Sequence, residues 1–315
     1  MKTDLLVWAL AVAVIACGTV GIAAEPNRGD AAALEGAPYE RIVSLYAAHT
    51  ENLLVMGAAD RLIGVDAQAA NLPGARGKPV FSYHDDPERF LGARPDLVLI
   101  RPMIARGYPR LVDRLVQSGI QVISMQPTTV DELADYWRLL GRLAGCPGPA
   151  EQMCQTFVAA VADFKRLSAR VDQPKRVYFQ AMHDTMKTFA PRAMAIFALE
   201  TAGGINVASD APVRANNNIA VYGKERLLAH ADRIDVFLAQ HGAMNQASVA
   251  TIMAEPGFGV IEAVKSGEVY LVDETIVSRP TLGLLQGIHR IGCLLYPDLY
   301  CSDGRAILAA AGVGG

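Results

Sequence analysis

The feature that most limits how this chain can fold is one continuous stretch, GPAEQMCQTFVAAVADFKRLSARV, at residues 148–171. Its apolar residues recur every three or four positions, which predicts a long helix with a single buried stripe. The stripe consists of Met153, Phe157, Val161, Phe164 and Leu167. A helix of this length spans on the order of 30 Å, enough to cross a small domain. We therefore expect a connecting helix at residues 148–172 between two similar halves.

Predicted strands and helices alternate on both sides of this helix. The segments RIVSLY, DLVLI and QVISM read as buried strands before it, and RVYFQA, IDVFLA and EVYLVD read as strands after it. Strands separated by helices at this spacing predict parallel sheets covered on both faces. The predicted fold class is α/β, with Rossmann-like lobes at residues 40–147 and 173–301 joined by one long rigid helix. Residues 302–315 are assigned to a tail.

The first 24 residues are predicted to be an export signal. Lys2 precedes an apolar run from Leu5 to Ala16, which is too short to span a bilayer but fits a signal peptide. Two cleavage modes stay open. The sequence VIAC resembles a lipobox, which would make Cys17 a lipidation site, whereas the small residues through Ala24 suit an ordinary signal peptidase. We expect a periplasmic protein, or one on the outer face of the cytoplasmic membrane, whose only membrane attachment would be that lipid.

The composition of the chain and its lack of catalytic motifs argue against two classes of function, nucleic-acid binding and catalysis. The chain has 315 residues, of which 51% are hydrophobic and 19% charged, so it can bury two sizeable cores. A net charge of −3 without a Lys/Arg cluster excludes nucleic acid as a partner. The chain contains no G-x-G-x-x-G, P-loop, G-x-S-x-G or H-E-x-x-H motif, which argues against an exported enzyme. We expect a monomer without catalytic activity or a resident cofactor.

Beyond Cys17, four cysteines remain, and an exported location permits disulfides. Four cysteines allow three pairings. The simplest joins Cys146 to Cys154 and Cys293 to Cys301, because each pair brackets a helix end beside turn-forming prolines. Free buried thiols are the alternative. A metal cluster is disfavoured because no C-x-x-C spacing occurs.

Ligands of open parallel sheets bind beyond the carboxyl ends of the strands. Tyrosine and histidine can ligate a metal or stack on a macrocycle, and arginine suits carboxylates. The candidate ligand contacts after the predicted strands are Tyr46, His49, Tyr83, His84, Arg101, His183, His241 and Arg279. For each histidine, a hydrogen-bonded loop residue remains the alternative. The loop at 206–223, with Arg214 and Asn216–Asn218, is a further candidate to line the cleft.

The two halves of the chain also contain one pair of similar segments. DPERFLGARPDLVLI and GKERLLAHADRIDVFLA share a Glu-Arg pair, a spacer and a hydrophobic strand, which places Glu88 and Glu225 at equivalent positions. Four further segments occur in a characteristic order and spacing, namely ERIVSLYAAHTENLLVMGAADRLIGVD, PERFLGARPDLVLI, ETAGGINVA and GEVYLVDETIVSRPTLGLLQGIHRIGCLLYPDLY. On these segments, over residues 40–300, the chain resembles class III (cluster A-II type) periplasmic substrate-binding proteins, which serve ABC importers of iron-siderophore, haem and cobalamin.

This resemblance implies two lobes with little hinge movement, a metal chelate of iron or cobalt in the cleft, and an ABC permease and its ATPase as partners. It also implies that one acidic residue on each lobe docks on the permease, at Glu88 and Glu225. Ordinary first-turn glutamates are the alternative for both. The second function considered is a receptor for bare zinc or manganese, with His49, His84, His183 and an acid such as Asp273 as ligands. The absence of a histidine-rich loop argues against it.

Overall fold

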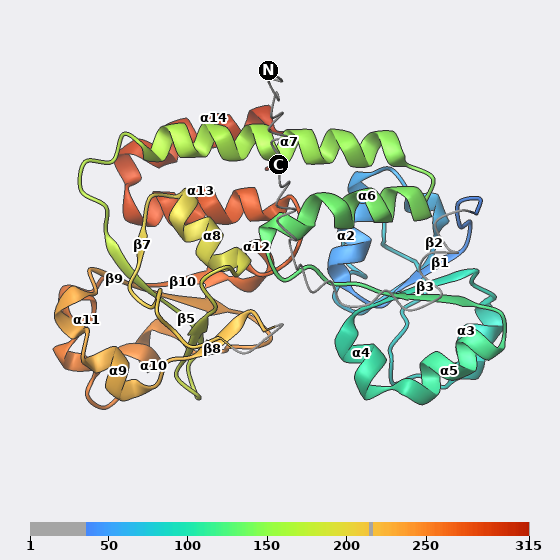
Figure 1. Ribbon diagram of the computed structural model, residues 1–315, viewed down its shortest axis with the longest axis horizontal. Coiled ribbons are helices and arrows are strands. Elements are labelled where there is room, and N and C mark those ends of the chain that lie inside the picture. Colours follow the sequence, from blue (N-terminus) through green and yellow to red (C-terminus); the bar gives the residue numbers. More distant parts are fainter. Residues whose placement is uncertain (1–35, 214–216, 315) are drawn as a thin grey trace, which may run out of the picture.

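The predicted connecting helix is α7 (Pro147–Ser168), which lies along one side of both lobes (Figure 1). The computed structural model describes residues 36–213 and 217–314. The predicted signal segment with Cys17, and Arg214 and Asn216, lie outside the described residues. Helix α7 begins at Pro147, where the missing N–H of proline removes no helical hydrogen bond. No helix within the described ranges combines the length and apolar character needed to cross a membrane.

The N-terminal lobe contains a four-stranded parallel sheet in the order β2-β1-β3-β4. The strands are β1 (Ile42–Ser44), β2 (Leu62–Val65), β3 (Leu97–Ile100) and β4 (Gln121–Ser124). The helices of this lobe are α2 (Ala47–Val55), α3 (Pro87–Ala93), α4 (Pro102–Gly107), α5 (Pro109–Gln117) and α6 (Leu133–Leu143), with short 3₁₀ turns η1 (Ala59–Arg61) and η2 (Val130–Glu132). All residues of β1 and β3 are buried, as expected for strands covered on both faces.

The C-terminal lobe contains a second sheet in the order β10-β9-β5-β6-β8, with β7 also paired to β5. The strands are β5 (Arg176–Met182), β6 (Lys187–Phe189), β7 (Ile205–Asn206), β8 (Ile219–Val221), β9 (Val236–His241) and β10 (Val269–Asp273). The helices are α8 (Met194–Thr201), α9 (Lys224–Leu228), α10 (Val249–Met253), α11 (Glu262–Ser266), α12 (Glu274–Val277), α13 (Gly283–Leu295) and α14 (Pro297–Ala310), with 3₁₀ turns η3 (Ala231–Arg233) and η4 (Phe258–Val260).

This second sheet corrects one detail of the predicted fold. The α/β class is confirmed, but β6 runs antiparallel to both β5 and β8, so the sheet is mixed rather than parallel. A tight turn after β5 reverses the chain. In it, the Met186 N–H donates to the His183 carbonyl at 3.0 Å, and Met186 adopts a left-handed φ of 47°. A four-residue reversal leaves no room for the helix that a parallel crossover needs.

Helix α7 packs against both lobes. All five residues of the predicted stripe are buried. The Phe157 ring lies 5.4 Å from the Trp137 ring of α6 and 6.3 Å from the Phe197 ring of α8, measured between centroids. Residues 302–310, assigned above to a tail, belong instead to α14, which packs against α7 (Figure 1). The connecting helix is therefore part of the hydrophobic core of the whole molecule.

Further contacts join the lobes away from α7. Thr129 and Ala193 form an isolated antiparallel bridge. The Pro280 carbonyl, which follows α12, accepts hydrogen bonds from Asn52 Nδ2 at 2.9 Å and from Trp137 Nε1 at 3.2 Å. Because both donors are fully buried in the N-terminal lobe, the segment around Pro280 is attached firmly to that lobe.

Candidate functional site

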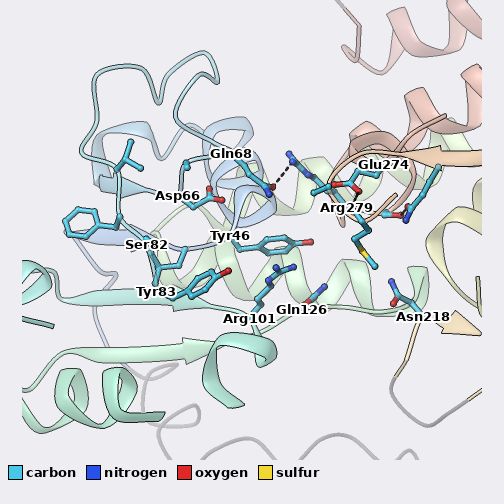
Figure 2. Close-up of a pocket in the computed structure, with 18 of the residues that line it drawn as sticks. Tyr46, Asp66, Gln68, Ser82, Tyr83, Arg101, Gln126, Asn218, Glu274 and Arg279 are labelled. Carbon is cyan, nitrogen blue, oxygen red and sulfur yellow. Dashed lines mark hydrogen bonds between the residues drawn. The ribbon is translucent and has the colours of Figure 1, made fainter. Parts of the chain in front are cut away.

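A cavity of roughly 400 Å³ lies between the two lobes. Figure 2 shows Tyr46, Tyr83 and Arg101 on its N-terminal side and Asn218 and Glu274 on its C-terminal side. Other polar or flexible side chains in its wall are Asp66, Gln68, Ser82, Gln126, Gln240, Met244, Ser278 and Arg279.

The strands position these side chains at their carboxyl ends. Asp66 and Arg101 each directly follow a strand of the first sheet, and Glu274 directly follows β10. Tyr46 lies just beyond β1, where it is the N-cap residue of α2. The cavity therefore lies at the edge at which open α/β sheets bind ligands.

Tyr46 and Arg101 form the N-terminal face of the cavity. The Arg101 guanidinium carbon lies 5.1 Å from the centroid of the Tyr46 ring, within range of a cation–π contact. Burial raises the pKa of Tyr46 to about 12, so its phenol stays protonated at neutral pH. Within the described part of the chain, Arg101 forms no ion pair with a carboxylate. Its positive charge is therefore available to an anionic ligand group.

Arg279 enters the cavity from the segment after α12 and contacts the opposite lobe. It forms an ion pair with Glu51 of α2, and its Nη2 donates to Gln68 Oε1 at 3.1 Å (Figure 2). Burial raises the pKa values of Glu51 and Asp66, whereas the nearby positive charge of Arg279 lowers both pKa values. The cavity thus carries charges of both signs.

The C-terminal wall includes amide, carboxylate and thioether groups. Gln240 is held in place because its Nε2 donates to the Ala181 carbonyl at 2.9 Å and its Oε1 accepts from Ser278 at 2.9 Å. Glu274 accepts from the Met244 N–H at 3.1 Å, while the Met244 side chain is 51% exposed beside the cavity. A flexible thioether next to fixed amides can contact a large ligand with both apolar and polar groups.

Four predicted ligand contacts line the cavity, namely Tyr46, Tyr83, Arg101 and Arg279, and the four predicted histidines do not. His49 is fully buried, with Nδ1 at 2.7 Å from the Tyr136 hydroxyl and Nε2 at 3.2 Å from the Ile100 carbonyl, and burial lowers its pKa to about 4. His183 is also buried, with Nδ1 at 3.1 Å from Gln180 Oε1. Both are hydrogen-bonded core residues, which was the stated alternative.

The other two histidines are exposed. His84 lies beside the rim, with its ring centroid 4.5 Å from that of Tyr83, and His241 is exposed at the end of β9. Within residues 36–213 and 217–314, no three His, Cys, Asp or Glu side chains are arranged to hold a metal ion. Asp273 instead caps α12 by accepting from the Thr275 N–H at 2.7 Å. The bare-metal site built from these residues is therefore wrong.

Several wall residues were missed by the strand-end prediction, chiefly Asp66, Gln68 and Gln126. Gln126 was accessible to the same reasoning, because it follows the predicted strand QVISM as directly as Arg101 follows DLVLI. Asp66 follows β2, which was not among the predicted strands. Gln68 lies in an irregular segment without a hydrophobic pattern, so the sequence carries no signal for it.

The predicted disulfide between Cys146 and Cys154 is wrong. Cys146 caps α7 and Cys154 lies eight residues further along the same helix. At about 1.5 Å per residue the two Cα atoms are about 12 Å apart, whereas a disulfide needs less than about 7 Å. All four described cysteines have free thiols in this structure, Cys293 and Cys301 included.

The predicted docking glutamates lie on the side of the molecule opposite α7. Glu88 is in the first turn of α3 and Glu225 in the first turn of α9, and Figure 1 places both helices on that side. The Glu88 side chain is 67% exposed and its Oε1 lies 2.9 Å from Arg114 Nη2.

Comparisons with known proteins agree with this architecture. Residues 42–275 match the family model described as periplasmic binding protein. The vitamin B12-binding protein of Vibrio cholerae is 25% identical over 256 residues, which cover 81% of this chain and 88% of that protein. An uncharacterized ABC transporter substrate-binding lipoprotein of Bacillus subtilis is 21% identical, covering 83% and 81%. The solved structure of the periplasmic heme-binding protein RhuT from Roseiflexus sp. RS-1 has a TM-score of 0.68 at 23% identity, covering 82% and 98%.

These relatives are binding proteins rather than enzymes, as the lack of catalytic motifs predicts. The matched region contains both sheets and α7, and the lobes place their strand ends around one shared cavity. The chain belongs to the periplasmic binding protein family.

Proposed function

We propose that this protein captures a metal chelate in the cavity between its lobes and delivers it to an ABC permease. The observation that carries the proposal is the shared cavity itself, in which Tyr46 and Arg101 of one lobe face Asn218 and Met244 of the other. A ligand held there contacts both lobes at once, so both lobes contribute to its recognition.

The cavity chemistry supports a chelate of iron or cobalt as the ligand. Two tyrosines offer aromatic faces for a macrocycle, while Arg101 and Arg279 suit peripheral carboxylates. Relatives are described as binding vitamin B12 and haem, both of which are metal-containing macrocycles. We propose haem, cobalamin or a ferric siderophore as the cargo class, with Tyr46, Tyr83, Arg101 and Arg279 as the contacts.

Delivery requires a membrane partner. Glu88 and Glu225 lie in matching first turns of the two lobes, and two separated carboxylates orient a receptor on basic sockets more than they add affinity. We propose them as the docking residues. The Bacillus subtilis relative is described as a lipoprotein, which supports Cys17 as a lipid anchor for a chain that acts in the periplasm or on the membrane surface.

The experiment is a visible-absorption titration of the mature chain with hemin, cyanocobalamin and a ferric siderophore, followed by native mass spectrometry. One of them should bind with one-to-one stoichiometry. Arg101→Met should weaken that affinity about tenfold or more, because a charge-assisted hydrogen bond is lost. The control is Arg106→Met, an exposed arginine outside the cavity wall. Failure of all three ligands to bind at micromolar concentration, or an equal loss in the control, would contradict the proposal.

A further inference from the structure

Helices α13 and α14 form a close antiparallel pair around the corner at Tyr296. Glycines allow the approach at two places. A Cβ added to Gly292 would lie 2.1 Å from Cδ1 of Tyr300, and one added to Gly304 would lie 2.7 Å from Cδ2 of His289. Helix pairs with such small residues at the contact have interaxial distances near the lower limit of about 8 Å. The two contacts set the register, in which residues 292 and 293 lie beside 300 and 301.

Cys293 and Cys301 occupy this register. Cys293 on α13 and Cys301 on α14 are near enough for Cys301 to raise the pKa of the Cys293 thiol, and Cys293 Sγ also lies 3.4 Å from His289 Nε2. Cys293 is partly buried between the helices, whereas Cys301 is exposed. The other two cysteines have different neighbours, because Cys154 contacts the Ala134 carbonyl at 3.7 Å and Cys146 contacts that of Ala144 at 3.5 Å. One facing thiol pair is thus present among the described residues.

We propose that Cys293 and Cys301 form a disulfide that cross-links α13 to α14, with the exposed Cys301 as the first sulfur to react. The oxidant is an external disulfide, either of a thiol–disulfide oxidoreductase or of oxidised glutathione. The Cys301 thiolate attacks one sulfur of that disulfide and releases one thiol. The Cys293 sulfur then attacks Cys301 Sγ and releases the second thiol. The pair loses two electrons and two protons, and the external disulfide is reduced to two thiols.

Burial and the neighbouring Cys301 raise the pKa of Cys293 to about 12, which agrees with Cys293 as the second sulfur to react. The cross-link would close the corner at Tyr296 and hold α14 on α13 and α7. This inference does not depend on the identity of the cargo, because it concerns only the helix layer behind the C-terminal sheet.

The experiment uses the mature chain, folded, with reduced thiols, and incubated with oxidised glutathione before denaturation, alkylation and tryptic digestion. The tryptic peptide Ile291–Arg305 contains both cysteines of the pair, and Leu143–Lys165 contains the other two, so the chain supplies its own control. The first peptide should be two hydrogens lighter and unalkylated, and the second should be alkylated twice. Disulfide formation should raise the Tm by about 5 °C.

Two variants test the order of reaction. Cys293→Ser should accumulate glutathione on Cys301, and Cys301→Ser should leave Cys293 unmodified over the same time, while Cys146→Ser should still form the cross-link. Double alkylation of Ile291–Arg305 after oxidation would overturn the proposal. The proposal would also be overturned if both thiols escaped alkylation because zinc was retained, without the loss of two hydrogens that a disulfide produces. Neither the peptide masses nor the Tm depends on cargo binding. A negative result would therefore contradict the disulfide without contradicting the proposed receptor function.

Discussion

Arg279, which belongs to the C-terminal half, forms an ion pair with Glu51 of the N-terminal lobe. The next residue, Pro280, accepts hydrogen bonds from Asn52 and Trp137 of the same lobe. A ligand-facing arginine therefore sits on a segment that also joins the lobes, so its position depends on their relative orientation. Ligand contact and lobe geometry are coupled through these adjacent residues.

The first prediction compares the two members of that ion pair. Arg279→Gln and Glu51→Gln both remove the pair, and both should lower the Tm. Only Arg279→Gln removes the positive charge from the cavity, so it should weaken binding of a carboxylate-bearing chelate about tenfold. Glu51→Gln keeps that charge and removes a competing acceptor, so affinity should be unchanged or higher. Equal losses of affinity in a titration of both variants would show that Arg279 only joins the lobes.

The second prediction concerns Phe157 of α7, whose ring contacts one aromatic residue from each lobe. Phe157→Ala should lower the free energy of unfolding by about 3–5 kcal/mol, because it leaves a cavity between α6, α7 and α8. The matched control is the adjacent Val158→Ala, since Val158 is 66% exposed and its change should cost less than about 0.5 kcal/mol. Urea denaturation followed by circular dichroism measures both. Similar losses would mean that α7 does not share its core with the lobes.

The third prediction concerns the pH dependence of stability at His49. The Ile100 carbonyl can only accept a hydrogen bond, so the Nε2–H of His49 donates to it and Nδ1 accepts from the Tyr136 hydroxyl. This arrangement needs a neutral ring. Burial lowers the pKa of His49 from 6.5 to about 4, so the unfolded chain takes up a proton that the folded protein resists. The stabilisation is present above pH 6.5 and is lost as the pH falls towards 4.

Protonation of His49 in the unfolded chain should lower the free energy of unfolding at pH 5 by about 2 kcal/mol relative to pH 7.5. Urea denaturation at both pH values measures it, and His49→Gln should remove this part of the difference whatever its own stability at pH 7.5. If His49→Gln kept the full wild-type difference in free energy of unfolding between the two pH values, the pH dependence would belong to other groups.

The success and failure of the sequence-based site prediction follow from the local backbone. Tyr46 and Arg101 line the cavity because each lies at the point where a strand passes into a helix. His49 lies three residues further, inside the first turn of α2, and the helical rotation directs it back into the core. Beyond the first one or two residues after a strand, predicting whether a side chain faces the cavity requires knowing which face of the following helix is buried.

The C-terminal lobe was harder to predict for a different reason. The alternation of strands and helices predicted the strands β5, β9 and β10 and the helix α7. Strands β6 and β8 have three residues each, too few for a hydrophobic period, and their pairing depends on the turn at Met186. That turn carries His183 into the core, where its Nε2 lies 3.5 Å from Glu255, instead of towards the cavity.

The last prediction concerns docking. The double variant Glu88→Gln and Glu225→Gln should bind the cargo as tightly as wild type and should abolish uptake by cells that carry the cognate permease, because it removes one carboxylate from each lobe on the face opposite α7. Titration measures the first property and transport of labelled cargo the second. The control is Asp172→Asn with Asp298→Asn, two exposed acids at other positions in the same protein, which should transport normally.

Glu88 needs a further comparison because it already pairs with Arg114 at 2.9 Å. An exposed pair of this kind contributes at most about 1 kcal/mol, so basic groups of a permease can replace Arg114 at little cost. Arg114→Gln should therefore leave uptake intact or improve it, since it frees the Glu88 carboxylate. If Arg114→Gln lost uptake as fully as the glutamate variant, Glu88 would act through the structure of α3 and α5. Docking by its carboxylate would then be excluded.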